Sequence, residues 1–308
     1  MKKTAIAIAL TSATAFANAQ TVEVKLPTFY GKMNVTQEFV QQENDGSYSR
    51  LQSNASRLGL KGDFALNDEL TAFYQAEYQI DVDGDADDAK ALTMRNTFVG
   101  AKGSFGKVQA GLFDTALKAA QGKVDQFNDL PGDIKNIVTN SENREANAVR
   151  YSTPSLSGLV LTVDHINAEE EGAHNGLSLS AVYSRDAIYA AVAHDSEVEG
   201  EGVSVTRVVG QVSLADLTLG ALWETEDDNG ESADGFMVSA ALKATSKVAL
   251  KAQLASSDIK AEGSEQMSLG ADYKLAKNAK TFVFATMGEN DAEDSGVQVY
   301  GAGVEYKF

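Results

Sequence analysis

Three histidines are the side chains best suited to acid–base chemistry near neutral pH, and two of them stand beside an aspartate. His165 follows Asp164 and His194 precedes Asp195, whereas His174 lies in an acidic stretch. Catalysis needs a nucleophile or water, a base and an orienting group within mutual reach. Neighbouring residues of a strand point to opposite faces, so neither pair forms a dyad by itself. We therefore expect no enzyme and no catalytic residues.

A second candidate for chemistry is the acidic stretch at residues 81–88, which resembles a calcium loop in its density of carboxylates. An EF-hand loop counted from Asp81 needs glycine at its sixth position and glutamate at its twelfth. The sequence has Ala86 and Leu92 there. The absence of cysteine also excludes thiolate metal sites and disulfides. We expect a solvated loop, no metal site and no cofactor, with weak sharing of divalent cations with lipopolysaccharide as the alternative.

Composition narrows the function classes further. The 308 residues include 44 acidic and 26 basic side chains, for a net charge of −18. A nucleic-acid partner is not expected, because such proteins need clustered lysine and arginine to replace phosphate counterions. With 43% hydrophobic residues the chain is not disordered, yet no apolar stretch approaches the roughly 18 residues of a membrane helix.

The first 19 residues have the organisation of a secretory signal peptide. Lys2 and Lys3 give a positive start, an apolar stretch follows at residues 5–10, and residues 17–19 form a small-residue cleavage site. We expect cleavage after Ala19, which leaves a domain of 308 − 19 = 289 residues at 20–308. An amphipathic first helix of a cytosolic protein is the alternative.

The rest of the chain has a hydrophobic period of two. One example is residues 71–80, where Ala72, Tyr74, Ala76, Tyr78 and Ile80 alternate with Thr71, Phe73, Gln75, Glu77 and Gln79. Similar alternation occurs at residues 177–184, 217–224, 236–243, 248–255, 267–275 and 297–308. Side chains of a strand point alternately to its two faces, so each stretch predicts a strand with one apolar and one polar face.

The connections alternate between tight turns and longer acidic loops, which is typical of an outer-membrane barrel. We expect an all-β fold: a transmembrane antiparallel β-barrel of about 16 strands. Aromatic girdles at the membrane boundary are expected from Tyr151, Tyr183, Trp223, Phe236, Tyr273 and Phe284. An acidic secreted β-sandwich is the alternative, because it allows the same period.

The last strand has its own signature. Tyr300, Ala302, Val304, Tyr306 and Phe308 share one face, and the aromatic Phe308 is the final residue. This arrangement resembles the terminal strand that barrel-assembly machinery recognises. We expect Tyr306 and Phe308 to form that assembly signal, with Phe308 as a simple membrane-boundary anchor as the alternative.

Four stretches resemble motifs of the general, non-specific porins of Gram-negative bacteria. They are residues 56–62, the hairpin of residues 95–100 and 103–108, residues 144–154 and residues 303–308. The resemblance implies an outer-membrane channel that forms a homotrimer, contacts lipid and lipopolysaccharide, and passes ions and small hydrophilic solutes. The family usually has glycine–arginine after its fifth strand, whereas this chain has Gly111, Leu112 and Phe113, so one customary pore arginine is missing.

Residues 118–143 are too long for a plain turn. Leu117, Ala120, Val124 and Phe127 recur at intervals of three and four, which predicts a short amphipathic helix. In the family that this chain resembles, the third external loop folds into the barrel and narrows it. We expect residues 118–143 to form this constriction, with a loop lying on the rim as the alternative.

The alternation of side chains along the strands, together with the charges of the proposed constriction, then predicts which residues line the narrowest part of the channel. Arg57, Arg95 and Arg150 are expected on the lumen side, opposite lipid-facing Leu58, Phe98 and Tyr151. The proposed constriction carries Asp125, Asp129 and Asp133, and Lys61 and Lys102 are secondary candidates. A basic wall facing an acidic loop would create a transverse field at the narrowest point. The acidic loops and the missing arginine favour cations weakly.

Two classes of function remain. The first is an open diffusion channel for small hydrophilic solutes, and the second is a structural or adhesive barrel with a plugged lumen. About sixteen strands leave a water-filled interior, whereas eight to ten are filled by side chains. The sequence therefore favours the channel.

Overall fold

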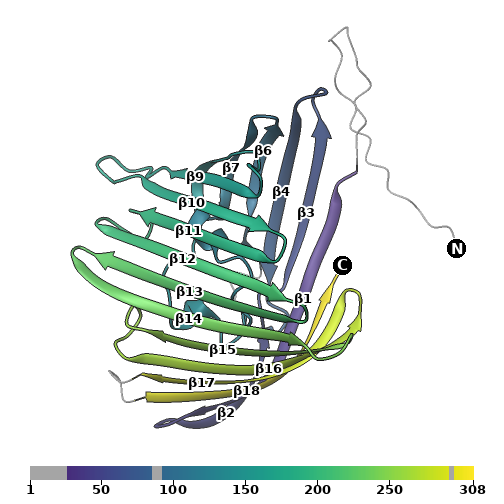
Figure 1. The fold of residues 1–308 in the computed structure, drawn as a ribbon, viewed down its shortest axis with the longest axis vertical. Coiled ribbons are helices and arrows are strands. Elements are labelled where there is room, and N and C mark those ends of the chain that lie inside the picture. The colour runs from purple at the N-terminus through teal and green to yellow at the C-terminus, as the bar shows by residue number, and fades with distance from the viewer. Residues whose placement is uncertain (1–25, 85–91, 291–294) are drawn as a thin grey trace, which may run out of the picture.

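The structure is a computed structural model that describes residues 26–84, 92–290 and 295–308 (Figure 1). The first half of the sheet consists of β1 (Thr28–Gln42), β2 (Gly46–Ser53), β3 (Arg57–Ala65), β4 (Thr71–Ile80), β5 (Leu92–Met94), β6 (Thr97–Gly103), β7 (Gly106–Asp114), β8 (Arg144–Ser152) and β9 (Leu159–Ile166). The second half consists of β10 (Gly176–Arg185), β11 (Ile188–Ser196), β12 (Val203–Leu214), β13 (Leu217–Asp228), β14 (Glu231–Lys243), β15 (Val248–Ser257), β16 (Ser264–Ala276), β17 (Ala279–Asn290) and β18 (Ser295–Lys307). The helices are α1 (Ala116–Ala120) and the 3-10 helix η1 (Ile134–Asn136).

The described strands form one closed antiparallel barrel. Apart from the two interruptions described next, each pairs with its neighbours in sequence, and β1 pairs with β18 to close the sheet. β2 and β3 both pair with β1, and β5 and β6 both pair with β4, so each of these two pairs is one interrupted barrel strand. The 18 segments are therefore 18 − 2 = 16 barrel strands, which confirms the predicted fold class.

Both interruptions insert one extra residue. Val35 pairs with Ser53 and Lys32 with Arg57, so three steps along β1 face four along its partner. Tyr78 pairs with Met94 and Gln75 with Phe98, which gives the same three against four. Such bulges re-aim the side chains that follow them, and both lie beside arginines of the lumen.

The outer face of the barrel is apolar. Exposed outward residues such as Val99, Leu254 and Val283 have exposed fractions of 65%, 52% and 55%. A face of this composition suits hydrocarbon, as the alternation predicted. Five of the six expected girdle aromatics are on this exposed side: Tyr151, Tyr183, Trp223, Phe236 and Tyr273.

Two orientations differ from the prediction. Phe284 is buried inside with Phe282, because β17 is apolar on both faces and its outward position is Val283. Phe98 faces the lumen, where its ring contacts Phe113, because the extra residue before β6 reverses the alternation.

The barrel has two different ends. At the turn end, the connections at residues 104–105, 186–187, 215–216 and 277–278 are short, and both the start of β1 and the end of β18 lie there. The described loops at the opposite loop end, apart from residues 115–143, carry Glu43, Asp45, Asp81, Asp83, Glu169, Glu170, Glu171, Glu197, Glu199, Glu201, Asp258 and Glu262. Lys260 is the basic residue among these described loops.

Some expectations lie outside the described residues. These are the proposed signal peptide at 1–19 and much of the acidic stretch at 81–88, which is described only as far as residue 84. No helix of the described residues is both long and apolar enough to cross a membrane.

Candidate functional site

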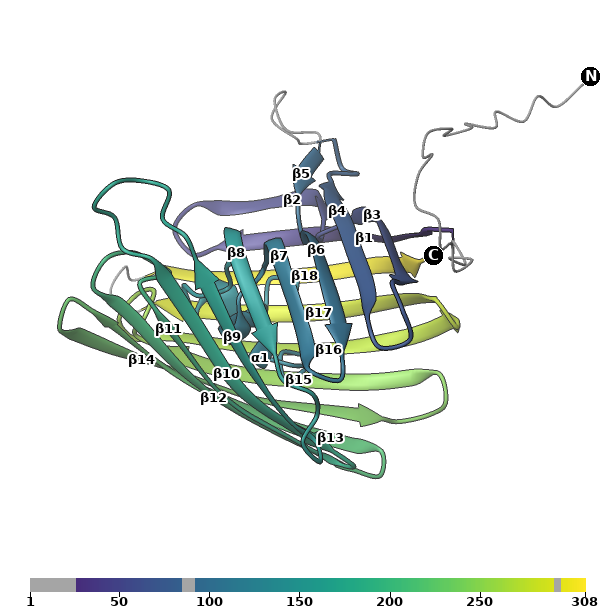
Figure 2. The ribbon, with the colours of Figure 1, turned by 90° about the horizontal axis from the view of Figure 1, so that it is seen from above.

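Residues 115–143, which we call the inner loop, run from β7 to β8 inside the ring of strands (Figure 2). Thr115 caps α1 by accepting the Lys118 N–H at 3.1 Å. The helix is shorter than the apolar spacing predicted, and the chain turns at Gly122, whose φ is +64°. The residues that set that spacing are all buried, namely Leu117, Ala120, Val124 and Phe127.

The inner loop packs against the wall of the barrel. Leu117, Val124 and Val138 form one apolar cluster with wall residues that include Leu222 and Met237. Phe127 and Leu130 form a second cluster with Phe282 and Phe284. These clusters fill one side of the lumen and fix the loop there, because burial of apolar surface is the main stabilising term.

Wall glycines make room for the loop. A Cβ at Gly220 would lie 3.1 Å from the Cβ of Val124, and one at Gly235 would lie 2.6 Å from the carbonyl oxygen of Val138. Any larger side chain at these two positions would push the inner loop away from the wall.

The start of the inner loop is held by charged wall residues. The N–H of Ala116 donates to Asp164 Oδ2 at 2.7 Å, and the N–H of Leu117 donates to Ser178 Oγ at 3.1 Å. Arg150 binds the same Asp164 carboxylate with two hydrogen bonds of 2.6 Å. Arg150 also donates to the carbonyl oxygen of Asp114 at 2.7 Å.

Arg207 is fully buried between the wall and the inner loop. Its guanidinium pairs with Glu224 on β13 and with Glu142 on the loop, the latter at 2.9 Å. It also donates to Thr139 Oγ1 at 3.0 Å and to the carbonyl oxygen of Leu117. One arginine thus joins both ends of the loop to the barrel.

The tip of the inner loop is attached to the opposite part of the sheet. Lys32 on β1 donates to Asp129 at 2.6 Å, and Asp129 has a φ of +66°. Burial alone would raise the pKa of Asp129, but the combined attraction of Lys32, Arg57 and Lys135 holds this pKa below its usual range. Asp129 therefore stays ionised and bound.

Two further aspartates organise the tip. Asp133 caps η1, accepting the N–H groups of Asp129 at 2.7 Å and Lys135 at 2.9 Å. Asp125 accepts the N–H groups of Phe127 and Ile134 at 2.8 and 3.1 Å. Burial, and secondarily the charge of Asp133, raise the pKa of Asp125 to about 7.

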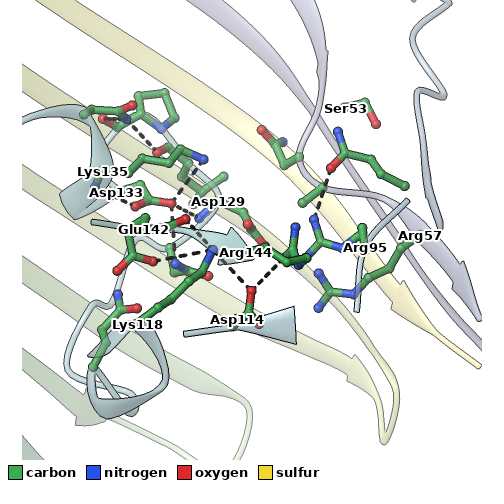
Figure 3. A pocket seen from close by; sticks show the side chains of 18 of the residues that line it. Ser53, Arg57, Arg95, Asp114, Lys118, Asp129, Asp133, Lys135, Glu142 and Arg144 are labelled. Atoms are coloured by element: carbon green, nitrogen blue, oxygen red, sulfur yellow. Dashed lines mark hydrogen bonds and ion pairs between the residues drawn. The ribbon is translucent and has the colours of Figure 1, made fainter. Parts of the chain in front are cut away.

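Arginines line the wall that faces the inner loop. Arg95 contacts Glu77 at 2.8 Å, and Arg57 contacts the same carboxylate at 3.7 Å. Arg144 pairs with Asp114 at 2.9 Å. Figure 3 shows these three arginines on one side of the opening.

A polar cavity of about 640 Å³ separates this wall from the inner loop. Its basic lining residues are Arg50, Arg57, Arg95, Lys118, Lys135 and Arg144, and its acidic ones are Glu38, Asp114, Asp129, Asp133 and Glu142. The lining charge is therefore 6 − 5 = +1. Opposite charges face each other across the opening while the total stays close to neutral.

The predicted site residues have different positions. Arg57, Arg95, Asp129 and Asp133 line the cavity together. Arg150 and Asp125 are not part of its lining and instead hold the inner loop. Sequence reasoning did not single out Arg50, Arg144, Lys118, Lys135 or Glu142. Arg144 lies an even number of residues before Arg150, so simple alternation along the sequence could have indicated it, although an extra residue of β8 lies between the two.

The secondary candidates lie nearer the turn end. Lys61 Nζ lies 4.9 Å from the centroid of the Tyr30 ring, and Lys102 pairs with Asp63 at 3.6 Å. Neither lines the cavity beside the inner loop.

The region where the family usually has a pore arginine is occupied here by Phe113. Gly111 has a φ of +140° where β8 carries one extra residue, and Phe113 is buried on the same face of β7 as Gln109. The guanidinium of Arg150 lies 4.7 Å from the centre of the Phe113 ring. The Phe113 ring of β7 thus packs against the Arg150 guanidinium of the neighbouring strand β8.

The terminal aromatics lie on the outer face. Tyr306 and Phe308 stack with ring centres 5.8 Å apart and have exposed fractions of 45% and 42%. Phe308 exchanges two backbone hydrogen bonds with Gly31, at 3.0 and 3.1 Å. The final residue therefore takes part in closing the barrel.

The sequence profile of Gram-negative porins matches residues 4–293. The chain belongs to the Gram-negative porin family. This confirms the resemblance, and since the family is non-enzymatic it also confirms that the protein is not an enzyme. Two curated relatives are the major outer membrane protein P.IB of Neisseria sicca and a monosaccharide porin of a Halomonas species. Each is 28% identical over 187 residues, which cover 57% and 53% of this chain and 51% and 49% of those proteins.

Solved porin structures have the same fold. The anion-selective porin from Comamonas acidovorans has a TM-score of 0.75 at 18% identity, over 92% of this chain and 99% of that one. The Salmonella typhi OmpF complex with daunomycin has a TM-score of 0.74 at 16% identity, over 92% and 97%. This chain spans about half the length of the curated relatives that it matches.

Proposed function

We propose that this porin is an outer-membrane diffusion channel for ions and small hydrophilic solutes. The observation that carries the proposal is the cavity of about 640 Å³ between the arginine wall and the inner loop. The loop is packed on one side of the barrel, so the polar space beside it remains open to water. A sixteen-stranded barrel is wide enough for such a passage.

The inner loop acts as the constriction. Arg57 and Arg95 face Asp129 and Asp133 across the opening, and Arg150 and Asp125 keep the loop in place. A polar solute crosses by aligning its dipole with this transverse field and exchanging water for charged side chains. A bulky apolar solute gains no replacement for the ordered water that it displaces.

The channel prefers cations mildly. The acidic loops at the loop end raise the local concentration of cations at that mouth. The constriction itself has a lining charge of only +1, so it adds little discrimination of its own. One similar protein is named as an anion-selective porin and another as a monosaccharide porin, so we assign no single solute class to this chain from them.

Export and assembly follow the expected route. A signal peptide at residues 1–19 directs the chain across the inner membrane, and residues 20–308 form one barrel domain. Tyr306 and Phe308 are read by the barrel-assembly machinery, which the exposed stacked pair supports. The mature porin contacts outer-membrane lipid and lipopolysaccharide and forms a homotrimer, a state named for OmpT of Vibrio cholerae, which shares the fold at a TM-score of 0.70.

Liposome swelling tests the proposed channel. Vesicles containing the folded protein should swell in neutral sugars at rates that fall steeply with sugar size, because the constriction limits passage. Heat-denatured protein is the control. A folded barrel that gives no swelling with any sugar and no ion flux would leave the plugged structural or adhesive barrel as the function.

A further inference from the structure

A second cavity, which we call the lysine vestibule, lies at the turn end between the connections at residues 244–247 and 277–278. Its volume is about 390 Å³. Its basic lining residues are Lys243, Lys247, Lys274, Lys277, Lys280 and Lys307. The strand residues Lys243 and Lys274 alternate with outward, exposed Leu242 and Leu275, so they face the lumen and not the lipid.

The carboxylates of the vestibule do not balance these lysines. Asp272 and Glu305 are its two acidic lining residues, which leaves 6 − 2 = +4. Asp272 already binds Lys280 at 2.8 Å and Lys251 at 3.0 Å, and Glu305 binds Lys307 at 2.9 Å. The positive charge is therefore concentrated on the remaining lysines.

Three of these lysines are free to bind a ligand. Lys243, Lys274 and Lys277 have no ion-pair partner within the described part of the chain. Lysine ammonium groups on flexible stems are donors that can converge on one anion without a fixed geometry.

The sheet register holds like charges side by side. Lys274 is directly opposite Lys280, and the N–H of Lys274 donates to the carbonyl oxygen of Lys247 at 2.8 Å. Like charges directly opposite each other destabilise an antiparallel pair. Asp272 already offsets the charge of Lys280, and an anion bound by Lys274 would offset the repulsion that remains.

A hydroxyl donor completes the vestibule. Thr245 Oγ1 accepts the N–H groups of Lys247 and Val248 at 3.1 and 3.0 Å, so its hydrogen is left to donate elsewhere. Several ammonium groups and a hydroxyl suit an oxyanion with several charged oxygens. Phosphate-bearing solutes have that chemistry.

We propose that the lysine vestibule binds soluble phosphate-type oxyanions, on the turn side of the channel. This rests on the proposed channel function, because the ligand must reach a lumen-facing site. The acidic loop end repels anions, whereas the lysine vestibule attracts them. Polyanions should therefore occupy the pore, and reduce its current, more readily from the turn side than from the loop side.

The test uses inorganic tripolyphosphate in planar bilayers. It is added to one side at a time while single-channel current is recorded. Turn-side addition should give half-block at a concentration about tenfold lower than loop-side addition, because charge-assisted contacts form only from there. The block should weaken as KCl rises, since salt screens exposed charges.

Matched variants identify the site. The triple exchange K243Q, K274Q and K277Q should raise the turn-side half-block concentration about tenfold, whereas Lys260→Gln at the loop end should leave it unchanged. The orientation of each channel is assigned with Lys260→Cys, because the natural chain has no cysteine and an impermeant thiol reagent reaches this residue from the loop side.

The outcomes separate the two proposals. Equal half-block concentrations from both sides, or an unchanged turn-side half-block concentration in the triple variant, would overturn the proposed oxyanion site. Neither result would contradict the channel function. A folded protein without any current would instead refute the channel function. Calorimetric titration of the detergent-solubilised protein with tripolyphosphate provides a second readout, in which heat of binding should disappear in the triple variant.

Discussion

Single side chains decide where the inner loop lies. Arg207 joins β12 to both ends of the loop, and Lys32 joins β1 to Asp129 at its tip. The anchoring role of neither residue was predicted, because the alternating strand pattern places both in the lumen and does not tell a buried, paired side chain from a solvated one. Their roles depend on which distant carboxylate faces them, and only the folded barrel determines that.

Arg207→Met tests the first of these anchors. The exchange leaves the buried carboxylate of Glu224 without its partner, so the free energy of unfolding should fall by about 3–5 kcal/mol. Urea unfolding of the porin in lipid vesicles measures the change. The released loop should also produce current noise that the unmodified channel lacks.

A double variant provides the control. Adding Glu224→Gln to Arg207→Met removes the unpaired charge, so part of the lost stability should return. If the single and double variants were equally unstable, the buried pair would not be the reason for the loss.

Asp125 should make the inner loop sensitive to pH. Its pKa is raised to about 7, above the value of about 3.9 for an exposed aspartate, so the folded loop retains a proton that the unfolded chain releases. Loop stability should therefore fall as pH rises from about 4 to about 7 and then level off. Hydrogen exchange of the Phe127 and Ile134 amides, corrected for intrinsic rates, measures this.

Asp125→Asn is the matching variant for that experiment. An amide does not titrate in this range, so the pH dependence of protection should disappear even if overall protection is lower. Persistence of the same pH dependence in Asp125→Asn would assign it to another group.

At the scale of elements, alternation predicted the sixteen strands because one face of most of them must be apolar. It failed where local geometry changes the period. The extra residue between β5 and β6 directs the Phe98 side chain into the lumen instead of toward the lipid. Both faces of β17 are apolar, so the pattern did not show that Phe284 points inward. The helix in the inner loop was shorter than predicted because Gly122 turns the chain.

Wall glycines offer a test of how closely the inner loop approaches the sheet. Gly235→Val should displace Val138, whose carbonyl oxygen would lie 2.6 Å from the new Cβ, and should cost about 1–3 kcal/mol of stability. The displaced loop narrows the opening, so single-channel conductance should fall.

Gly210→Val is the matched control on β12, because a new Cβ there meets nothing within 4 Å. Its conductance should equal that of the unmodified porin. Equal conductance of both variants would mean that the inner loop does not limit the current.

At the scale of the whole molecule, charge is separated along the barrel axis. The loop end is acidic, the cavity beside the inner loop is nearly neutral and the lysine vestibule carries an excess of +4. The acidic loops were predicted from sequence. The lysine excess was not, because its members come from four different strands and two turns and converge only in the closed sheet.

The native protein should be a trimer. The purified porin in mild detergent should have a mass three times that of the heat-denatured chain, as measured by light scattering with the detergent contribution subtracted. A species with the mass of a single chain before heating would contradict the proposed homotrimer.

The most direct test of the constricted channel is the reversal potential of single channels under a KCl gradient. We expect current in steps of three and a small potential that favours cations. Replacing Arg57 and Arg95 with glutamine should increase the preference for cations, whereas Arg185→Gln at an exposed turn should not. Unchanged selectivity in the Arg57 and Arg95 variant would contradict control by the constriction, and no current from the folded barrel would contradict the channel itself.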